Sequence, residues 1–121
     1  MEDELVQLES FYLEPGFLLL ATNDDGERLG CVGARATSDV RQCEVRRMFI
    51  RPEGRGKGLG RALTDRLIVE AAEAGFTHLV LNTLPAMSEA ICLYESMGFV
   101  RCDPYVDEPL EGVLYYSLTL E

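Results

Sequence analysis

Alternating hydrophobic and polar positions in the first half of the chain predict strands. Turn-forming residues at 23–26 separate apolar runs at 17–21 and 29–36, and this pattern predicts a β-hairpin. Residues 42–50 alternate again and predict a third strand. We expect one of its faces to carry Cys43, Val45, Arg47 and Phe49, and the other to carry Glu44, Arg46, Met48 and Ile50.

A helical pattern follows the third predicted strand. Apolar residues at 59, 63, 67 and 71 have i+4 spacing and predict a helix that Gly75 ends. Its surface offers i,i+4 ion pairs between Arg61 and Asp65 and between Arg66 and Glu70.

The last third of the chain predicts three short strands and one more helix. The strand patterns cover 78–81, 99–102 and 113–120, and the long loop before the last of them holds Pro104 and Pro109. The helix ends at Gly98. Its apolar stripe consists of Met87, Ala90, Ile91, Tyr94 and Met97.

The order of these elements predicts an α/β fold with a mixed sheet, and 121 residues suit one domain spanning 1–121. Residues 1–16 precede the hairpin. Within them we expect one short helix at 2–12, with Leu5, Leu8 and Tyr12 roughly on one face.

Composition places the chain among globular proteins, with 47% hydrophobic and 26% charged residues. No apolar run approaches the roughly 18 residues of a membrane span, and the acidic start does not resemble a signal peptide, so we expect a cytoplasmic protein without a membrane partner. The four cysteines have no C-x-x-C spacing, which argues against a metal site and a disulfide framework. Buried free thiols are expected instead.

Charge is distributed unevenly along the chain. The formal net charge is -10, which argues against a protein that coats nucleic acid or anionic lipid. Residues 46–66 nevertheless hold seven of the eleven cations and only two acids, so this segment is +5 and the remainder -15. The distribution predicts a small anionic ligand near this segment.

A glycine-rich turn lies inside the cationic segment, between a predicted strand and a predicted helix. Its spacing fits neither a Walker loop nor the dinucleotide pattern G-x-G-x-x-G. What remains is Arg55-x-x-Gly58-x-Gly60 at the start of a helix. Amides without a Cβ, at the positive end of a helix dipole, predict a pyrophosphate site, and a flexible loop with a helix cap is the alternative.

These residues resemble the signature [QR]-x-x-G-x-[GA] of the GNAT superfamily of acyl-CoA-dependent N-acyltransferases. The segment Ala90–Phe99 is similar to a second superfamily block, A-x-x-L-Y-x-x-x-G-F. The resemblance covers residues from about 17 to the C-terminus. It implies a mostly antiparallel central sheet with flanking helices, and a V-shaped splay in which acetyl-CoA lies.

The resemblance also implies the cofactor contacts. The amides of residues 55–61 would hold the pyrophosphate, and the strand end would pair with the pantetheine arm. The implied cofactor-binding residues are Met48, Phe49, Ile50, Arg55, Gly56, Lys57, Gly58, Leu59, Gly60, Arg61 and Asn82.

Two residues are candidates for the chemistry of N-acetyl transfer. An acceptor ammonium must lose a proton before it attacks a thioester, and Glu44 has the position, relative to Arg55, of the general base in histone-type members. The departing thiolate needs a proton, which the Tyr94 phenol can donate. The alternatives are a Glu44 ion pair with Arg46 or Arg35 and a purely structural Tyr94.

The acceptor half is less complete than the cofactor half. Superfamily members begin with a strand and two helices, and here the short segment 1–16 stands in their place. The alternatives are an open cleft, a homodimer whose second subunit completes it, or a CoA-binding module without transfer. A nucleic-acid binder that uses the 46–66 cations is a further alternative. The acceptor is expected to be a small-molecule or protein amine, and an acidic lining of Glu44, Asp103, Asp107 and Glu108 would favour a cationic one.

Overall fold

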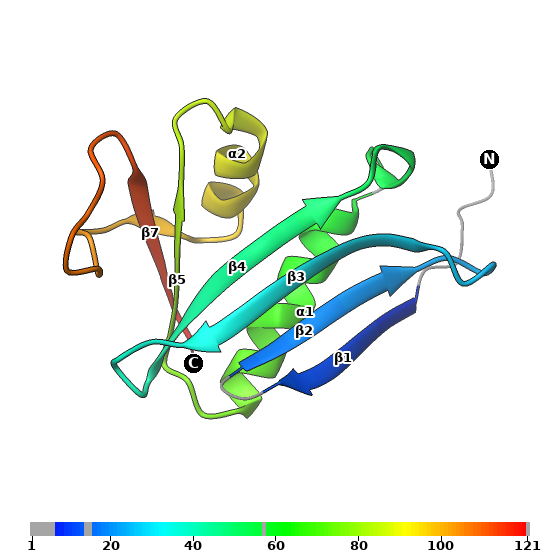
Figure 1. Cartoon of the computed structure of the whole chain (residues 1–121), viewed down its shortest axis with the longest axis horizontal. Coiled ribbons are helices and arrows are strands. Elements are labelled where there is room, and N and C mark those ends of the chain that lie inside the picture. Colours follow the sequence, from blue (N-terminus) through cyan, green and yellow to red (C-terminus); the bar gives the residue numbers. More distant parts are fainter. Residues whose placement is uncertain (1–6, 14–15, 57, 121) are drawn as a thin grey trace.

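One mixed sheet forms the centre of the molecule in the computed structural model, which describes residues 7–13, 16–56 and 58–120. Its strands are β1 (Gln7–Leu13), β2 (Gly16–Thr22), β3 (Arg28–Ala36), β4 (Gln42–Ile50), β5 (His78–Thr83), β6 (Val100–Arg101) and β7 (Leu114–Thr119). They are ordered β1-β2-β3-β4-β5-β7-β6 (Figure 1). The helical elements are the short 3-10 turn η1 (Pro52–Gly54) and the helices α1 (Leu59–Glu73) and α2 (Ser88–Ser96). The predicted α/β class is confirmed.

The sheet splays between β4 and β5. These two strands pair in parallel over three residue pairs, from Gln42 with His78 to Glu44 with Val80, whereas all other neighbours pair antiparallel. Beyond Glu44 the strands diverge toward α2, as Figure 1 shows. The mostly antiparallel sheet with a splay is therefore confirmed.

Helix α1 covers one side of β2, β3 and β4 (Figure 1). Its predicted apolar stripe is buried and consists of Leu59, Leu63, Leu67 and Ala71. The predicted ion pair between Arg66 and Glu70 is present at 2.8 Å. The guanidinium of Arg61 instead donates a hydrogen bond to the Ser96 hydroxyl at 2.7 Å, so this side chain ties α1 to α2.

The N-terminal segment corrects our expectation of a helix at 2–12. Residues 7–13 form β1, which pairs with β2 along its whole length, and residues 2–6 lie outside the described part. A helix this short is marginal on its own, whereas strand pairing satisfies the polar backbone groups at the edge of β2. Leu8 also packs against the core.

A β-bulge corrects the predicted faces of β4. Cys31 pairs with Phe49 and Gly33 with Arg46, so two residues of β4 oppose Val32 alone. An extra residue reverses the alternation. Met48 and Ile50 consequently pack against the core on the same side as Cys43 and Val45, while Phe49 is 53% exposed.

The four cysteines all lie in the described part of the chain, and none forms a disulfide. Cys43 is buried, Cys31 and Cys102 are half-buried, and Cys92 is exposed. The expectation of buried thiols is therefore wrong for Cys92. It lies two residues before Tyr94, so it projects from a different face of α2.

Candidate functional site

The glycine-rich turn presents the start of α1 to solvent. Gly56 and Gly58 have φ values of 77° and 75°, a conformation that favours glycine. The first intrahelical bond runs from the Ala62 amide to the Gly58 carbonyl, so the amides at 59–61 point out of the helix start. No acidic residue lies in the first turn of α1. The turn can therefore bind an anion, although Lys57 lies outside the described residues.

Contacts of Arg55, Gly60 and Arg61 hold this turn and the start of α1 against β4 and α2. The Arg55 side chain donates from Nε to the Ile50 carbonyl at 3.1 Å, which ties the turn to the end of β4. A Cβ at Gly60 would lie 3.2 Å from a Leu93 methyl group of α2. A glycine here lets α1 approach α2 closely, next to the bound Arg61 side chain.

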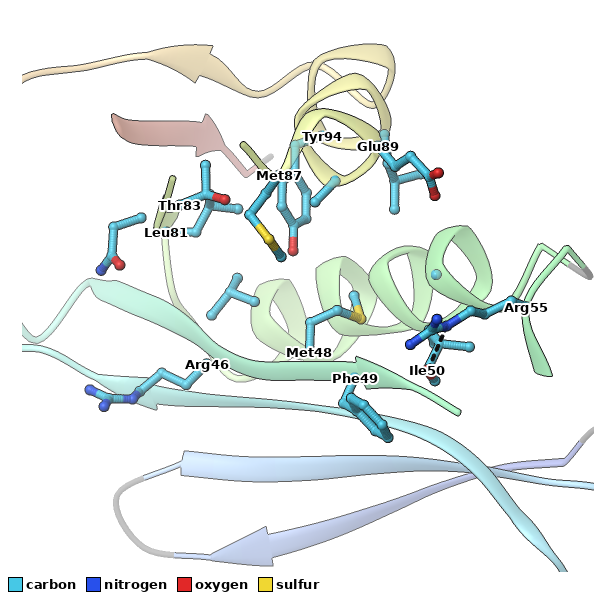
Figure 2. Close-up of a pocket in the computed structure, with 15 residues that line it drawn as sticks. Arg46, Met48, Phe49, Ile50, Arg55, Leu81, Thr83, Met87, Glu89 and Tyr94 are labelled. Carbon is cyan, nitrogen blue, oxygen red and sulfur yellow. Dashed lines mark hydrogen bonds between the residues drawn. The ribbon is translucent and has the colours of Figure 1, made fainter. Parts of the chain in front are cut away.

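A cleft of about 470 Å³ lies between β4, β5 and α2 (Figure 2). We call it the main cleft. Its lining includes seven predicted site residues: Met48, Phe49, Ile50, Arg55, Gly60, Asn82 and Tyr94. Gly56 and Gly58 belong to the adjoining turn, and Leu59 and Arg61 belong to the first turn of α1. Met87, predicted on the apolar stripe of the second helix, is 53% exposed and lines this cleft.

The main cleft has a free strand edge along one wall. Because β4 leaves β5 after Glu44, the backbone edge of residues 46–50 on that side has no partner strand in the described part of the chain. A strand edge offers amide and carbonyl groups to an extended ligand. The cleft thus combines a strand edge, apolar side chains and, at its end, the anion-binding turn.

Tyr94 projects from α2 into the space above β4, beside Met87 (Figure 2). Its ring packs against Phe99 with centroids 5.5 Å apart and is 6% exposed. Burial raises the pKa of its hydroxyl above the ordinary value of 10.0. The hydroxyl is therefore protonated at neutral pH and is able to donate a proton.

Glu44 is a buried carboxylate at the point where β4 and β5 separate, with 8% of the residue exposed. The Arg46 guanidinium donates to Oε1 at 3.1 Å, and the Tyr105 hydroxyl donates to Oε2 at 2.8 Å. The Asn82 amide also reaches Oε2, at 3.4 Å. Of the two ion-pair partners considered above, Arg46 is the one observed.

Tyr105 was not predicted from the sequence. It lies between β6 and β7, 61 positions from Glu44, with its ring edge-on to Tyr115 at 5.4 Å. Burial and the bond to Glu44 raise the pKa of Tyr105, so its hydroxyl stays a donor. The available signal was one aromatic residue in the acidic segment 103–108, which matches no motif.

Two smaller cavities adjoin Glu44. One, of about 230 Å³, is lined by Glu44, Val45, Arg46 and Asn82, and we call it the passage. The other, the loop pocket, has about 280 Å³ and is lined by Arg35, Ala36, Thr37, Ser38, Glu44, Tyr105, Val106 and Asp107. The passage shares three lining residues with the main cleft and shares Glu44 with the loop pocket. Glu44 therefore lies between the two larger spaces.

Some polar residues lie apart from these spaces. The histidine of the chain, His78, is exposed at the start of β5, with its Nδ1 3.0 Å from the Thr77 hydroxyl. Asp103 and Glu108, expected in an acidic lining, are exposed and line none of the three cavities, whereas Asp107 lines the loop pocket.

Comparison with known proteins bears on this arrangement. Residues 14–101 match the model of the acetyltransferase (GNAT) domain. An uncharacterized N-acetyltransferase of Schizosaccharomyces pombe is 35% identical over 121 residues, which is 99% of this chain and 74% of that protein. The chain spans only 31% and 60% of uncharacterized N-acetyltransferases from Dictyostelium discoideum and Escherichia coli.

Solved structures give the same result. A putative acyl-CoA N-acyltransferase from Klebsiella pneumoniae superposes with a TM-score of 0.82 at 25% identity, covering 92% of this chain and 77% of that one. A putative acetyltransferase from Salmonella typhimurium, solved with its cofactor acetyl-CoA, has a TM-score of 0.71 at 26% identity and covers 88% and 65% of the two chains.

Proposed function

The chain belongs to the GNAT family of acetyl-CoA-dependent N-acetyltransferases, and on that premise we propose that it acetylates a primary amine by direct attack in a ternary complex. The observation that carries this proposal is the placement of Glu44 and Tyr94. Tyr94 lines the main cleft, and Glu44 lies at the passage that leads out of it.

The described residues fit the cofactor that the family uses. The amides at the start of α1 suit the phosphates, and the free edge of β4 at residues 48–50 suits the amide groups of the pantetheine arm. The apolar lining by Met48, Leu81 and Leu93 suits the remainder of that arm. Gly58 and Gly60 keep side chains out of the approach to the helix start.

Bound acetyl-CoA supplies a thioester carbonyl that is open to attack and a sulfur that departs. Glu44, which hydrogen bonds from Arg46, Tyr105 and Asn82 hold in place, accepts a proton from the acceptor ammonium. Tyr94 donates a proton to the departing sulfur. The acceptor nitrogen loses two protons as its amide bond forms and the carbon–sulfur bond breaks: one leaves to solvent through Glu44, and one replaces the proton that Tyr94 gave.

Cellular setting and assembly are separate proposals. In the described part of the chain, no helix is long and apolar enough to cross a membrane. A cytoplasmic location, one domain over 1–121 and a homodimer that completes the acceptor side remain predictions. A sizing measurement tests the last, and an active monomer would contradict it.

The experiment that tests transfer has two readouts. We expect acetyl-CoA to raise the melting temperature, because a ligand that binds only the folded state stabilises it, and ATP and NAD to leave it unchanged. We expect thiol release with a panel of amines, and a loss of about 100-fold in kcat in Tyr94→Phe. Stabilisation by acetyl-CoA without thiol release would identify a non-catalytic binding module.

RNA binding that acetyl-CoA does not displace would favour the nucleic-acid alternative instead. Such binding is expected to weaken steeply with salt, because it depends on phosphate contacts.

A further inference from the structure

The loop pocket and the main cleft lie on either side of the passage. The passage shares Val45, Arg46 and Asn82 with the main cleft and Glu44 with the loop pocket. An amine bound in the loop pocket would therefore lie beside the Glu44 carboxylate, near the cleft in which the acetyl group is expected. This geometry makes the loop pocket the candidate acceptor site.

Arg35 is the distinctive group in this pocket. It is the cross-strand partner of Glu44 in the β3–β4 ladder, so the two side chains emerge as neighbours. Glu44 forms its ion pair with Arg46 instead. Arg35 is exposed, and no carboxylate pairs with it in the described part of the chain. Its guanidinium is available to a ligand.

The charges around the pocket balance. Two cations, Arg35 and Arg46, face two anions, Glu44 and Asp107. A polyamine would be repelled by the arginines, and a dicarboxylate would be repelled by the two carboxylates. A molecule with one ammonium and one carboxylate suits both Glu44 and Arg35. A guanidinium binds a carboxylate through two parallel hydrogen bonds. A volume of about 280 Å³ suits a single small molecule.

We propose that the acceptor is a small amino carboxylic acid, with its ammonium at Glu44 and its carboxylate at Arg35. The Ser38 hydroxyl lies in the same lining and offers a further donor to the carboxylate, whereas the Thr37 hydroxyl donates to the backbone carbonyls of Asp39 and Gln42. This assignment rests on the proposed transfer activity, and it names the substrate class that the activity leaves open.

The test compares matched acceptors. Each standard amino acid is assayed for thiol release beside its methyl ester and its decarboxylated amine, both of which keep the amine and lack the carboxylate. We expect at least one amino acid to exceed both analogues by about tenfold or more in kcat/KM, because the analogues leave Arg35 unpaired.

Arg35→Gln is the decisive variant. It should raise KM for that amino acid by about tenfold or more and leave kcat/KM for the decarboxylated amine unchanged. Arg41→Gln is the matched control, since Arg41 is exposed beside the same β3–β4 turn and lines none of the three cavities. It should match the parent protein.

Opposite results separate this proposal from the activity on which it rests. The acceptor class would be overturned, with transfer intact, if the decarboxylated amines reacted as fast as the amino acids. The same holds if the lysine side chains of a peptide reacted as fast as the amino acids. An equal effect of Arg35→Gln on both kinds of acceptor would also overturn the acceptor class. No thiol release from any acceptor would overturn transfer and acceptor class together.

Discussion

The main cleft and the loop pocket lie on either side of Glu44 and offer a ligand different kinds of groups. The anion-binding end of the cleft uses backbone amides and glycines within residues 55–61, on the start of one helix. The surroundings of Glu44 use side chains of residues 35, 46, 82, 105 and 107, which come from three strands and a loop. The backbone site consists of residues that are contiguous in the sequence, whereas the side-chain site consists of residues that only the fold brings together.

This contrast predicts two kinds of sensitivity. A change in the glycine turn should alter cofactor affinity through backbone conformation. A change at Glu44 or Tyr105 should alter the rate and leave cofactor affinity intact, because neither residue lines the main cleft. Of the four predictions that follow, from the largest expected effect to the smallest, the first three test this separation and the fourth concerns the residues at which the two regions join.

Glu44→Gln should lower kcat/KM by about 10²- to 10⁴-fold, because the amide cannot accept the ammonium proton. The dissociation constant of acetyl-CoA, measured by titration calorimetry, should stay within about twofold of the parent value. A variant with parent-level rates would exclude Glu44 as the base. A large loss of cofactor affinity would show that the two regions are not separable.

Tyr105→Phe should lower kcat by about tenfold while the KM for acetyl-CoA is unchanged, because Glu44 loses a donor that orients it. The ring contact with Tyr115 is kept. Tyr115→Phe is the control, since it removes the hydroxyl of the stacking partner, for which no bond to Glu44 is observed. Equal losses in both variants would contradict a specific role of the Tyr105 hydroxyl at Glu44.

Gly58→Ala should weaken acetyl-CoA binding by about three- to tenfold and destabilise the fold by about 1 kcal/mol, because its φ of 75° is unfavourable for alanine. Gly26→Ala is the matched control: Gly26 has a φ of 81° in the turn between β2 and β3, and both positions have open space for a Cβ. It should show the same loss of stability without the loss of affinity. Equal affinities in the two variants would contradict the backbone site.

The buried thiol of Cys43, in the pairing that joins β4 to β5, should make the folded state less stable at alkaline pH. Burial, with help from the Glu44 charge, raises the pKa of this thiol from 9.0 to about 12. The folded state keeps a proton that the unfolded chain gives up, so this contribution is complete below about pH 9 and is lost as the pH rises toward 12.

Denaturant midpoints between about pH 8 and pH 11 measure this effect. Cys43→Ala should flatten the decline, and Cys92→Ala, at an exposed thiol, should leave it unchanged. A parent protein of constant stability over this range would refute the prediction.

Local patterns were sufficient for most of the fold. The hairpin, the helix stripes and the turn at Gly58 follow from spacing within a few residues, because residues close in the sequence determine these elements. The strand β1 was missed because its stability comes from pairing with β2, which a single amphipathic stripe does not reveal.

The surroundings of Glu44 were harder to predict. The β-bulge in β4 reversed the alternation beyond Val45, and nothing in the sequence marks the extra residue. Tyr105 lies in a loop without periodicity, and its contact with Glu44 exists only once β7 and β4 are placed in one sheet. Glu44 itself was predicted only through the family resemblance.

The parallel seam of three residue pairs has a mechanical consequence. Among the described strands, β5, β6 and β7 form a sub-sheet whose strand pairing with the rest of the sheet consists of that seam alone, and Glu44 is the last residue of its β4 side. A rotation of one sub-sheet against the other would pivot beside the Glu44 carboxylate. The hydrogen bonds from Asn82 and Tyr105 to Glu44 cross this seam, so the contacts that hold the carboxylate also join the two sub-sheets.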